Sequence, residues 1–193
     1  MIKRFNRYEI KYVVHRDVAS QLKDDLQHYM HRDPHLTDAM PAYRVNSVYF
    51  DSLDVKSFWE KVDGVRFRRK VRIRTYGTAM PGKSFLEIKQ KTDMTTQKRR
   101  SKYPTADLIE RLVNGAGAPL EGELGEEVEL LFHEQGLEPK VLVSYDRIAY
   151  MGSTDDSLRV TFDSNCRYRT TDLFEANSAE PDKYFLHPSQ QVV

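Results

Sequence analysis

Residues 66–76, RFRRKVRIRTY, alternate between cationic and apolar side chains with the period of a β-strand. Successive side chains of a strand point to opposite faces. One face of this strand therefore carries Arg68, Lys70, Arg72 and Arg74, and the other carries Phe67, Val71 and Ile73, with Arg69 as the exception. Because the apolar face needs packing partners, we expect helices on that side and the cations on the opposite side.

Charge is strongly segregated along the chain, although the formal net charge is only +1. Fourteen Lys or Arg and three acids lie between Lys61 and Lys102, whereas residues 104–138 hold nine acids and one Arg. A basic block in a near-neutral chain indicates a binding site for a polyanion. A solvated charged face is the alternative interpretation.

The same sorting recurs in other segments that have strand character. Charged residues share one face in each of them: Glu9 and Lys11 within 5–14, Glu87, Lys89 and Lys91 within 84–91, Arg147 within 139–150, and Arg159 and Asp163 within 158–163. This repetition predicts an α+β fold, in which an antiparallel β-barrel has a charged interior and helices packed outside. The cations that line such a barrel would repel one another unless the interior held a polyanion or interleaved acids.

The remaining segments complete the expected order of elements. Periodicity and capping residues predict a strand at 43–51 and helices at 16–30, from Asp54 to Gly64, at 105–114 and at 122–135. In the second of these helices we expect Phe58 and Trp59 to face inward. Residues 92–103 are polar and basic, which predicts a connection between elements.

Composition limits the class of protein. The 193 residues suffice for one domain, and we expect residues 1–193 to form a single domain. No apolar run approaches the ~20 residues of a membrane-spanning helix, and the N-terminus lacks the apolar core of a signal peptide. A single cysteine, Cys166, excludes a disulfide framework, so we expect a cytoplasmic protein. We expect no nucleic-acid partner, because no known motif appears and a closed tunnel would exclude a duplex.

A chain of phosphates is a polyanion that matches these residues. Arg forks pair with phosphate oxygens two at a time, and a low-dielectric tunnel strengthens each contact. Phosphoryl transfer depends mainly on positioning and charge stabilisation, so it requires no nucleophilic side chain. Glu9 and Glu87 could hold a magnesium or manganese ion together with phosphate oxygens. Pairing with neighbouring Lys or Arg is the alternative role of these two acids.

Six blocks follow one another along the chain: RYEIKYVVH, YRVNSVYFDS, EKVDGVRFRRKVRIRTYG, FLEIKQK, QKRR and YDR. Together they resemble the VTC domain, a polyphosphate polymerase domain of the CYTH-like triphosphate tunnel superfamily. The resemblance implies a transferase that adds the γ-phosphate of ATP to a polyphosphate chain in a basic tunnel, with a divalent metal such as manganese or magnesium. ATP and polyphosphate or triphosphate are the ligands that it implies.

The resemblance also implies which residues act. The catalytic set is Lys11, Arg72, Arg74 and Lys89, and the further phosphate ligands are Lys98, Arg147 and Arg159. Arg99, Arg100 and Lys102 compete with Lys98 for its role. Glu9 and Glu87 are the metal-binding candidates within the chain. We expect the family's main metal-binding glutamate on a further strand beyond Val193, so that the domain is truncated at its C-terminus and its final strand is missing.

Two other functions would use nearly the same residues. A tunnel-fold triphosphatase would pass the phosphoryl group to water, and a non-catalytic module would only bind polyphosphate. Time courses of chain growth and of phosphate release separate these alternatives from a polymerase.

Overall fold

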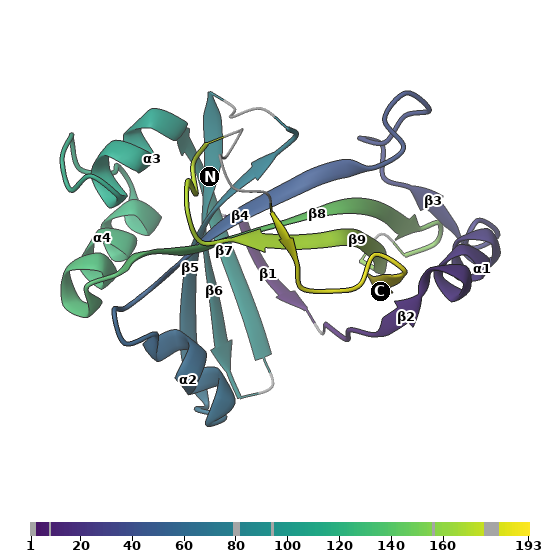
Figure 1. Cartoon of the computed structure of the whole chain (residues 1–193), viewed down its shortest axis with the longest axis horizontal. Helices are drawn as coiled ribbons and strands as arrows, with labels where there is room; N and C mark the ends of the chain where they lie inside the picture. The colour runs from purple at the N-terminus through teal and green to yellow at the C-terminus, as the bar shows by residue number, and fades with distance from the viewer. Residues whose placement is uncertain (1–2, 8, 79–81, 94, 156, 176–181) are drawn as a thin grey trace.

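The computed structural model describes residues 3–7, 9–78, 82–93, 95–155, 157–175 and 182–193, which form a curled sheet with helices outside it (Figure 1). The strands are β1 (Lys3–Arg7), β2 (Val13–His15), β3 (Met30–Arg32), β4 (Tyr43–Asp51), β5 (Phe67–Tyr76), β6 (Lys83–Thr92), β7 (Thr95–Pro104), β8 (Glu138–Gly152), β9 (Arg159–Arg169), β10 (Lys183–Tyr184) and β11 (Gln190–Val192). The helices are α1 (Arg16–Leu26), α2 (Lys56–Val62), α3 (Thr105–Leu112) and α4 (Glu123–Gln135).

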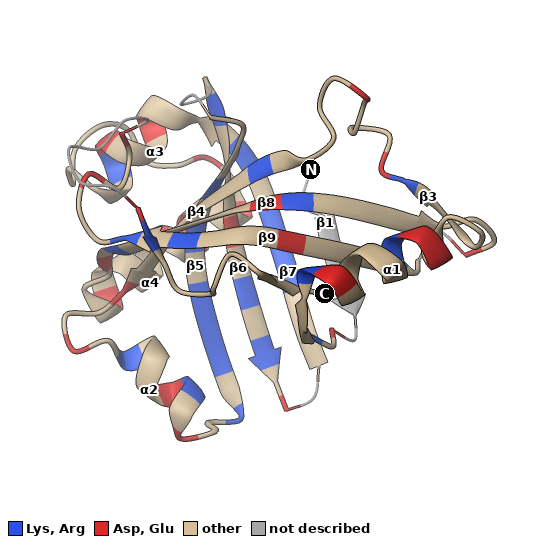
Figure 2. Ribbon diagram, turned by 45° about the vertical axis from the view of Figure 1, so that its right-hand side comes forward, with Lys and Arg blue, Asp and Glu red and all other residues tan. Residues whose placement is uncertain are grey.

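The strands form one sheet in the order β1-β7-β6-β5-β4-β8-β9-β11-β2. β3 pairs with β8, β10 pairs with β9, and every described pair is antiparallel. The sheet is strongly twisted, as Figure 1 shows: β5 and β6 run vertically, whereas β8 and β9 run horizontally. Figure 2 shows that Lys and Arg form repeated bands on β5, β6 and β7.

The two ends of this strand order are close together in sequence. β1 ends at Arg7 and β2 begins at Val13, yet they occupy opposite edges of the sheet. Six residue steps span at most about 20 Å, so the two edges must approach each other. The described ladders do not join β1 to β2, and the sheet is therefore curled into a tunnel-like form without full closure. The predicted antiparallel tunnel with helices outside is confirmed in this form.

The apolar faces of the strands pack against helices, as predicted. Strand residues such as Val48, Ile73 and Ile88 share the main core with Leu108 of α3 and Val128 of α4. A smaller cluster packs α1 against β8 and β9 through Ala19, Met30, Tyr150 and Phe162. Burial of each large apolar side chain contributes about 1.5–3 kcal/mol, so both clusters hold helices firmly on the outer face.

Two segments differ from their predicted structure. Residues 5–14 were expected as one strand, but the structure has two strands there, β1 ending at Arg7 and β2 beginning at Val13. Residues 92–103 were expected as a connection, yet most of them form β7, which pairs with β6 from Lys83↔Pro104 to Thr92↔Thr95. β7 is polar on both faces, and for this reason hydrophobic periodicity did not reveal it.

The helix α2 also departs from expectation. Phe58 and Trp59 are 51% and 53% exposed, so the prediction that they face inward is wrong. The carboxylate of Asp51 accepts hydrogen bonds from the backbone N–H groups of Ser57 and Phe58, which anchors the start of the helix. No helix in the described part of the chain has the length and apolar character needed to cross a bilayer.

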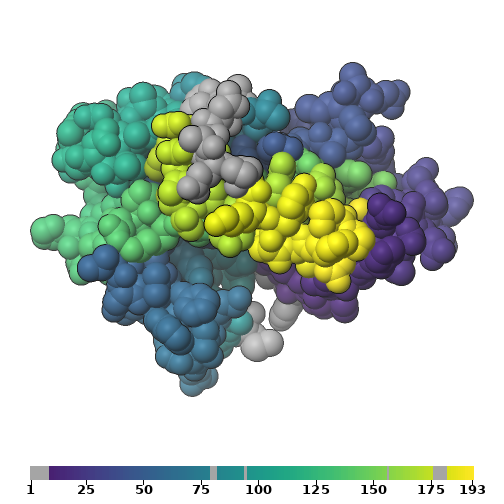
Figure 3. Space-filling view, in the orientation of Figure 1, coloured from purple at the N-terminus to yellow at the C-terminus, as the bar shows by residue number. Residues whose placement is uncertain are grey.

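The last residues of the chain lie against its N-terminal part. β11 pairs with β2 over Gln190–Val192, and Val192 is also the register partner of Asp163 on β9. Tyr12 and Val193 exchange backbone hydrogen bonds of 2.8 Å in both directions. Figure 3 shows the yellow C-terminal residues beside the purple N-terminal ones on one surface.

Candidate polyanion-binding site

The inner face of the sheet carries a dense set of cations on β5, β6 and β7. Two rows cross these strands by register: Arg72–Glu87–Arg100 and Lys70–Lys89–Lys98. The residues that alternate with them on β5, Val71 and Ile73, are each 2% exposed and belong to the main core. The predicted sorting of β5 is thus confirmed for Arg72 and Arg74, which meet Glu87 on the face opposite the core. Arg68, at the start of the strand, instead donates to the backbone oxygens of Glu60 on α2 and of Val65.

Glu87 is the centre of the cation cluster. Its side chain is 1% exposed, and its two oxygens lie 2.6 Å from Arg72 Nη2 and 2.7 Å from Lys98 Nζ. Arg74 Nε lies 3.9 Å from the same carboxylate. Burial alone would raise the pKa of Glu87, but Arg72, Arg74 and Lys98 lower it to about 2. One carboxylate therefore faces three cations, and the cluster keeps a net positive charge.

Lys98 is held in an unfavourable electrostatic position. Burial lowers the pKa of Lys98 to about 8, and the ion pair with Glu87 offsets only part of this effect. Arg72 and Arg74 lower the pKa further, because nearby positive charges disfavour another one. A bound anion would have the opposite effect and would stabilise the protonated amine.

Hydroxyl groups orient the two arginines of β5. Arg72 Nη1 donates to Tyr49 Oη at 2.7 Å. Arg74 donates to Ser47 Oγ at 3.1 Å and to Tyr145 Oη at 3.2 Å. These contacts hold both guanidinium groups in place without adding a negative charge. Burial would raise the pKa of the Tyr49 phenol, but Arg72 and Arg74 lower it below its usual value.

A row of three lysines, Lys70, Lys89 and Lys98, lies beside this centre. Like charges directly opposite each other on adjacent strands destabilise a sheet. Glu9 reduces this repulsion, because its Oε2 accepts a hydrogen bond from Lys89 Nζ at 2.6 Å and its Oε1 lies 3.4 Å from Lys11. Burial would raise the pKa of Glu9, but Lys89 and Lys11 lower it to about 2. Glu9 thereby brings Lys11 next to the lysine row.

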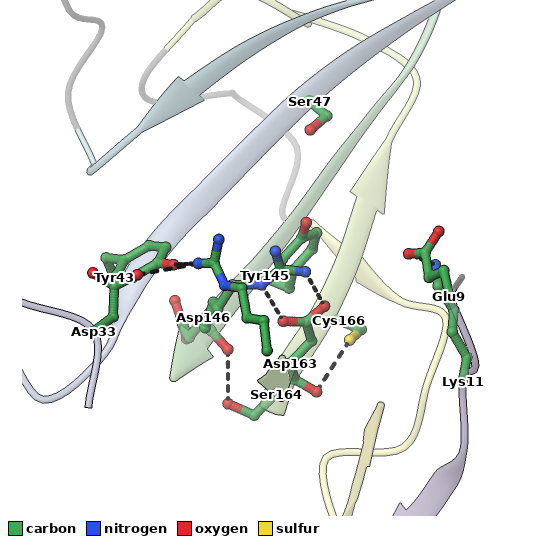
Figure 4. A network of polar contacts seen from close by, with 12 residues as sticks. Glu9, Lys11, Asp33, Tyr43, Ser47, Tyr145, Asp146, Asp163, Ser164 and Cys166 are labelled. Atoms are coloured by element: carbon green, nitrogen blue, oxygen red, sulfur yellow. Dashed lines mark hydrogen bonds and ion pairs between the residues drawn. The ribbon is translucent and has the colours of Figure 1, made fainter. Parts of the chain in front are cut away.

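On the inner face of β8 and β9, Arg147 and Arg159 each pair with an acid, and Figure 4 labels these two acids, Asp163 and Asp33. Arg147 donates two hydrogen bonds of 2.7 Å to the carboxylate of Asp163. Arg159 donates to Asp33 at 3.1 Å and to Tyr43 Oη at 3.0 Å. This part of the inner face is therefore balanced by one-to-one pairing.

The arginines that face the helices have a separate partner. Arg99 and Arg69 approach the carboxylate of Glu127 on α4 at 2.5 Å and 3.6 Å. Lys98, by contrast, lies on the inner face with Glu87. The alternation along β7 therefore assigns the inner position to Lys98 and the outer position to Arg99.

Most of the predicted phosphate ligands lie in one group, and Arg147 and Arg159 lie outside it. This group surrounds Glu87 and Glu9, and it contains Arg72, Arg74, Lys98, Lys89 and Lys11. Arg147 connects to this group through Tyr145, whose ring lies 5.0 Å from its guanidinium and whose hydroxyl accepts from Arg74. Arg159 lies apart, at the exposed start of β9. Phosphate binding by each residue remains a prediction.

Ser47, Tyr49 and Asp33 were not predicted as site residues. Ser47 and Tyr49 lie two positions apart in YRVNSVYFD, so strand alternation could have placed both on the inner face. Asp33 follows β3 in a loop and is 7% exposed. No periodic pattern indicates which strand such a loop residue will contact.

The acids of the described part of the chain do not fit a protein-held divalent cation. No group of three or more His, Cys, Asp or Glu side chains is close enough together there to hold one. Glu87 already faces Arg72 and Lys98 through its two oxygens, and Glu9 is bonded to Lys89. Metal binding by Glu9 and Glu87 stays a prediction from the sequence, and no reaction step is assigned to a metal.

A cavity of about 70 Å³ lies on the other face of the sheet. Its lining includes Arg44, Asn46, Ser144 and Arg169, together with the core residues Val48, Ile73 and Leu142. These residues alternate with the inner-face residues of β4 and β5. The cavity is therefore separate from the cation cluster.

A curled antiparallel sheet, helices on its outer face and a basic inner face together define a tunnel-fold domain. The chain belongs to the VTC domain family, whose model matches residues 6–193. A solved structure from Bacillus halodurans, described as a "putative adenylate cyclase", covers 97% of this chain and 80% of its own, with a TM-score of 0.52 and 14% identity. At that identity the likeness shows the fold alone. No curated protein matches the chain significantly.

Proposed function

We propose that this chain binds a phosphate chain on its inner face and extends it with the γ-phosphoryl group of ATP. The proposal is carried by the imbalance around Glu87, where one buried carboxylate faces three cations beside a row of lysines. A linear polyanion supplies negative charge along the whole row, whereas a single carboxylate ligand would reach only part of it. The VTC family membership supports the same function.

Arg72 and Arg74 are the residues best placed to bind the transferred phosphoryl group. Their guanidinium groups are already oriented by Tyr49, Ser47 and Tyr145, so little conformational entropy is lost on binding. Their charges would stabilise the negative charge on the equatorial oxygens in the transition state. Mutual orientation and charge stabilisation are the main contributions that phosphoryl transfer requires of a protein.

The lysine row would hold the acceptor chain in line with the donor. A terminal oxygen of the polyphosphate then attacks the γ-phosphorus and forms a new P–O bond. The bond between the γ-phosphorus and the β–γ bridging oxygen breaks, and ADP leaves with the electron pair. The polyphosphate oxygen is itself the nucleophile, so no side chain forms a covalent intermediate.

Incubation of the chain with ATP and manganese tests the proposal. Polyphosphate is followed on a gel and free phosphate is measured in the same samples. A ladder that grows with time is the expected result, and Arg72→Ala should abolish it while Arg69→Ala on the outer face should not. Free phosphate without a ladder would indicate a triphosphatase, and saturable polyphosphate binding without turnover would indicate a binding module. Absence of triphosphate binding would overturn the proposal altogether.

A further inference from the structure

Aromatic side chains line one end of the inner face. The ring centroids of Tyr43 and Tyr76 are 5.9 Å apart, and those of Tyr76 and Phe85 are also 5.9 Å apart. Both contacts are edge to face, so the rings form a continuous arc across β4, β5 and β6. We call these three residues the aromatic arc.

The aromatic arc borders the cation cluster directly. Tyr76 lies two residues beyond Arg74 on the same face of β5, a separation of about 7 Å along the strand. Phe85 is the register partner of Arg74, and Tyr43 is the register partner of Arg147. A ligand on the arc would therefore lie within one short linkage of the arginines that the proposed reaction uses.

Cations extend the aromatic arc toward β7. The Arg100 guanidinium lies 4.8 Å from the centre of the Phe85 ring, and Lys102 Nζ lies 5.7 Å from it. Tyr76 remains 39% exposed. This end of the inner face thus offers an exposed phenol ring at Tyr76 and a guanidinium group over the neighbouring ring of Phe85. Both groups stack on flat aromatic ligands.

The opposite end of β5 and β6 has a different character. Its inner face carries the cross-strand pairs Arg68↔Lys91 and Lys70↔Lys89. These positions offer positive charge for phosphates. The two ends of the same strands are therefore chemically distinct.

We infer that the aromatic arc is a nucleobase site, which fixes the direction in which the substrates enter. The base of the nucleotide stacks against Tyr76 and its neighbours, and the triphosphate points toward Arg74 and Arg72. The polyphosphate chain extends the other way, toward Lys70 and Lys89. This inference rests on the proposed function, because it takes a nucleoside triphosphate as the phosphoryl donor.

Paired titrations of ATP and inorganic triphosphate test the nucleobase site. Tyr76→Leu should weaken ATP binding about tenfold, because base–aromatic stacking is lost, while triphosphate binding should change less than about twofold. Tyr76→Phe keeps the ring and should retain ATP binding. Phe67→Leu, at the other end of β5, should leave both affinities unchanged. Equal losses for the two ligands, or no loss for either, would overturn the inference.

A measurement on the unmodified chain does not depend on the folding of a variant. ADP and pyrophosphate are compared as competitors of bound inorganic triphosphate. ADP should compete better by about tenfold, because the two competitors carry similar charge near neutral pH and only ADP has a base to stack. Equal or better competition by pyrophosphate would refute the nucleobase site while leaving phosphate binding intact. Failure of triphosphate itself to bind would instead refute the proposed function.

Discussion

The β5–β7 part and the β8–β9 part of the inner face balance their charges differently. In the first, Glu87 alone faces Arg72, Arg74 and Lys98. In the second, Arg147 forms two hydrogen bonds of 2.7 Å with Asp163. Burial does not explain the difference, since the Arg72 and Arg147 side chains are 12% and 21% exposed.

We interpret the β8–β9 part as a structural frame and the β5–β7 part as the binding surface. A buried arginine with its own carboxylate is electrostatically complete, so the β8–β9 part needs no ligand to be stable. The β5–β7 part retains positive charge in a partly desolvated place, which an incoming anion would neutralise. A polyanion site is therefore indicated by an imbalance of charge at similar burial, and the number of charges alone does not identify it.

Removal of the central acid should have the largest effect. Glu87→Gln leaves three cations facing a neutral group, and we expect the free energy of unfolding to fall by about 3–5 kcal/mol. Inorganic triphosphate should restore much of this loss, because it binds the folded state and supplies the missing charge. Urea unfolding with and without triphosphate measures both quantities.

Glu127→Gln is the matched control for this change. Glu127 also faces two arginines, Arg69 and Arg99, but on the outer face. Triphosphate should not restore the stability of this variant, and equal restoration in both variants would contradict a ligand site on the inner face.

Acid provides a second test of Glu87. Because its pKa is lowered, its contribution to the free energy of unfolding is present above pH 4.5 and is lost as the pH falls toward about 2. Glu87→Gln should flatten the stability profile in that range.

Loss of the two arginines of β5 should have the next largest effect. The double variant Arg72→Ala and Arg74→Ala should bind triphosphate well over tenfold more weakly, because each charge-assisted hydrogen bond contributes about 1.5–3 kcal/mol. Titration calorimetry measures the affinity, and circular dichroism checks that the fold is kept. The double variant Arg69→Ala and Arg99→Ala removes the same charge from the outer face. Unchanged affinity in the first variant would remove the inner-face site.

Strand alternation made much of the site predictable. A period of two fixes which side chains share a face, so the cations of β5 and the acid and lysines of β6 could be assigned to the inner face from sequence alone. Their apolar neighbours Val71 and Ile88 confirmed the outer face by packing into the main core. The presence of helices outside the sheet followed from the same apolar face.

The missed features depend on contacts between distant segments. β7 has no apolar face to reveal it, and its outer Arg99 is explained only by Glu127 of α4. The strand character of residues 5–14 gave no sign of a break. The break arises because this segment connects β1 and β2, which lie at opposite edges of the curled sheet. The exposure of Trp59 likewise depends on how α2 is anchored by Asp51. Local sequence patterns contain none of this information.

The lowered pKa of Lys98 predicts a smaller, pH-dependent effect. With a pKa of about 8, Lys98 loses its proton as the pH rises from 7 to 9, and the inner face loses one positive charge. Triphosphate affinity should therefore fall by roughly tenfold over this range, the value of one charged contact. Lys98→Arg keeps the charge and should give a flat profile. A decline of the same size in Lys98→Arg would assign the pH dependence to another group.

The smallest change is expected at Cys166, which reports on the β8–β9 part. The thiol is 3% exposed, lies 3.7 Å from the carbonyl oxygen of Asp163, and has its pKa raised by burial to about 11. Reaction with a disulfide reagent therefore requires local opening of β9. Triphosphate should alter the labelling rate by less than about twofold if this part is a complete frame, while Asp163→Asn should raise it by about tenfold or more. Strong protection of Cys166 by triphosphate would show instead that anion binding on β5–β7 also stabilises β9, and the division into frame and binding surface would then be wrong.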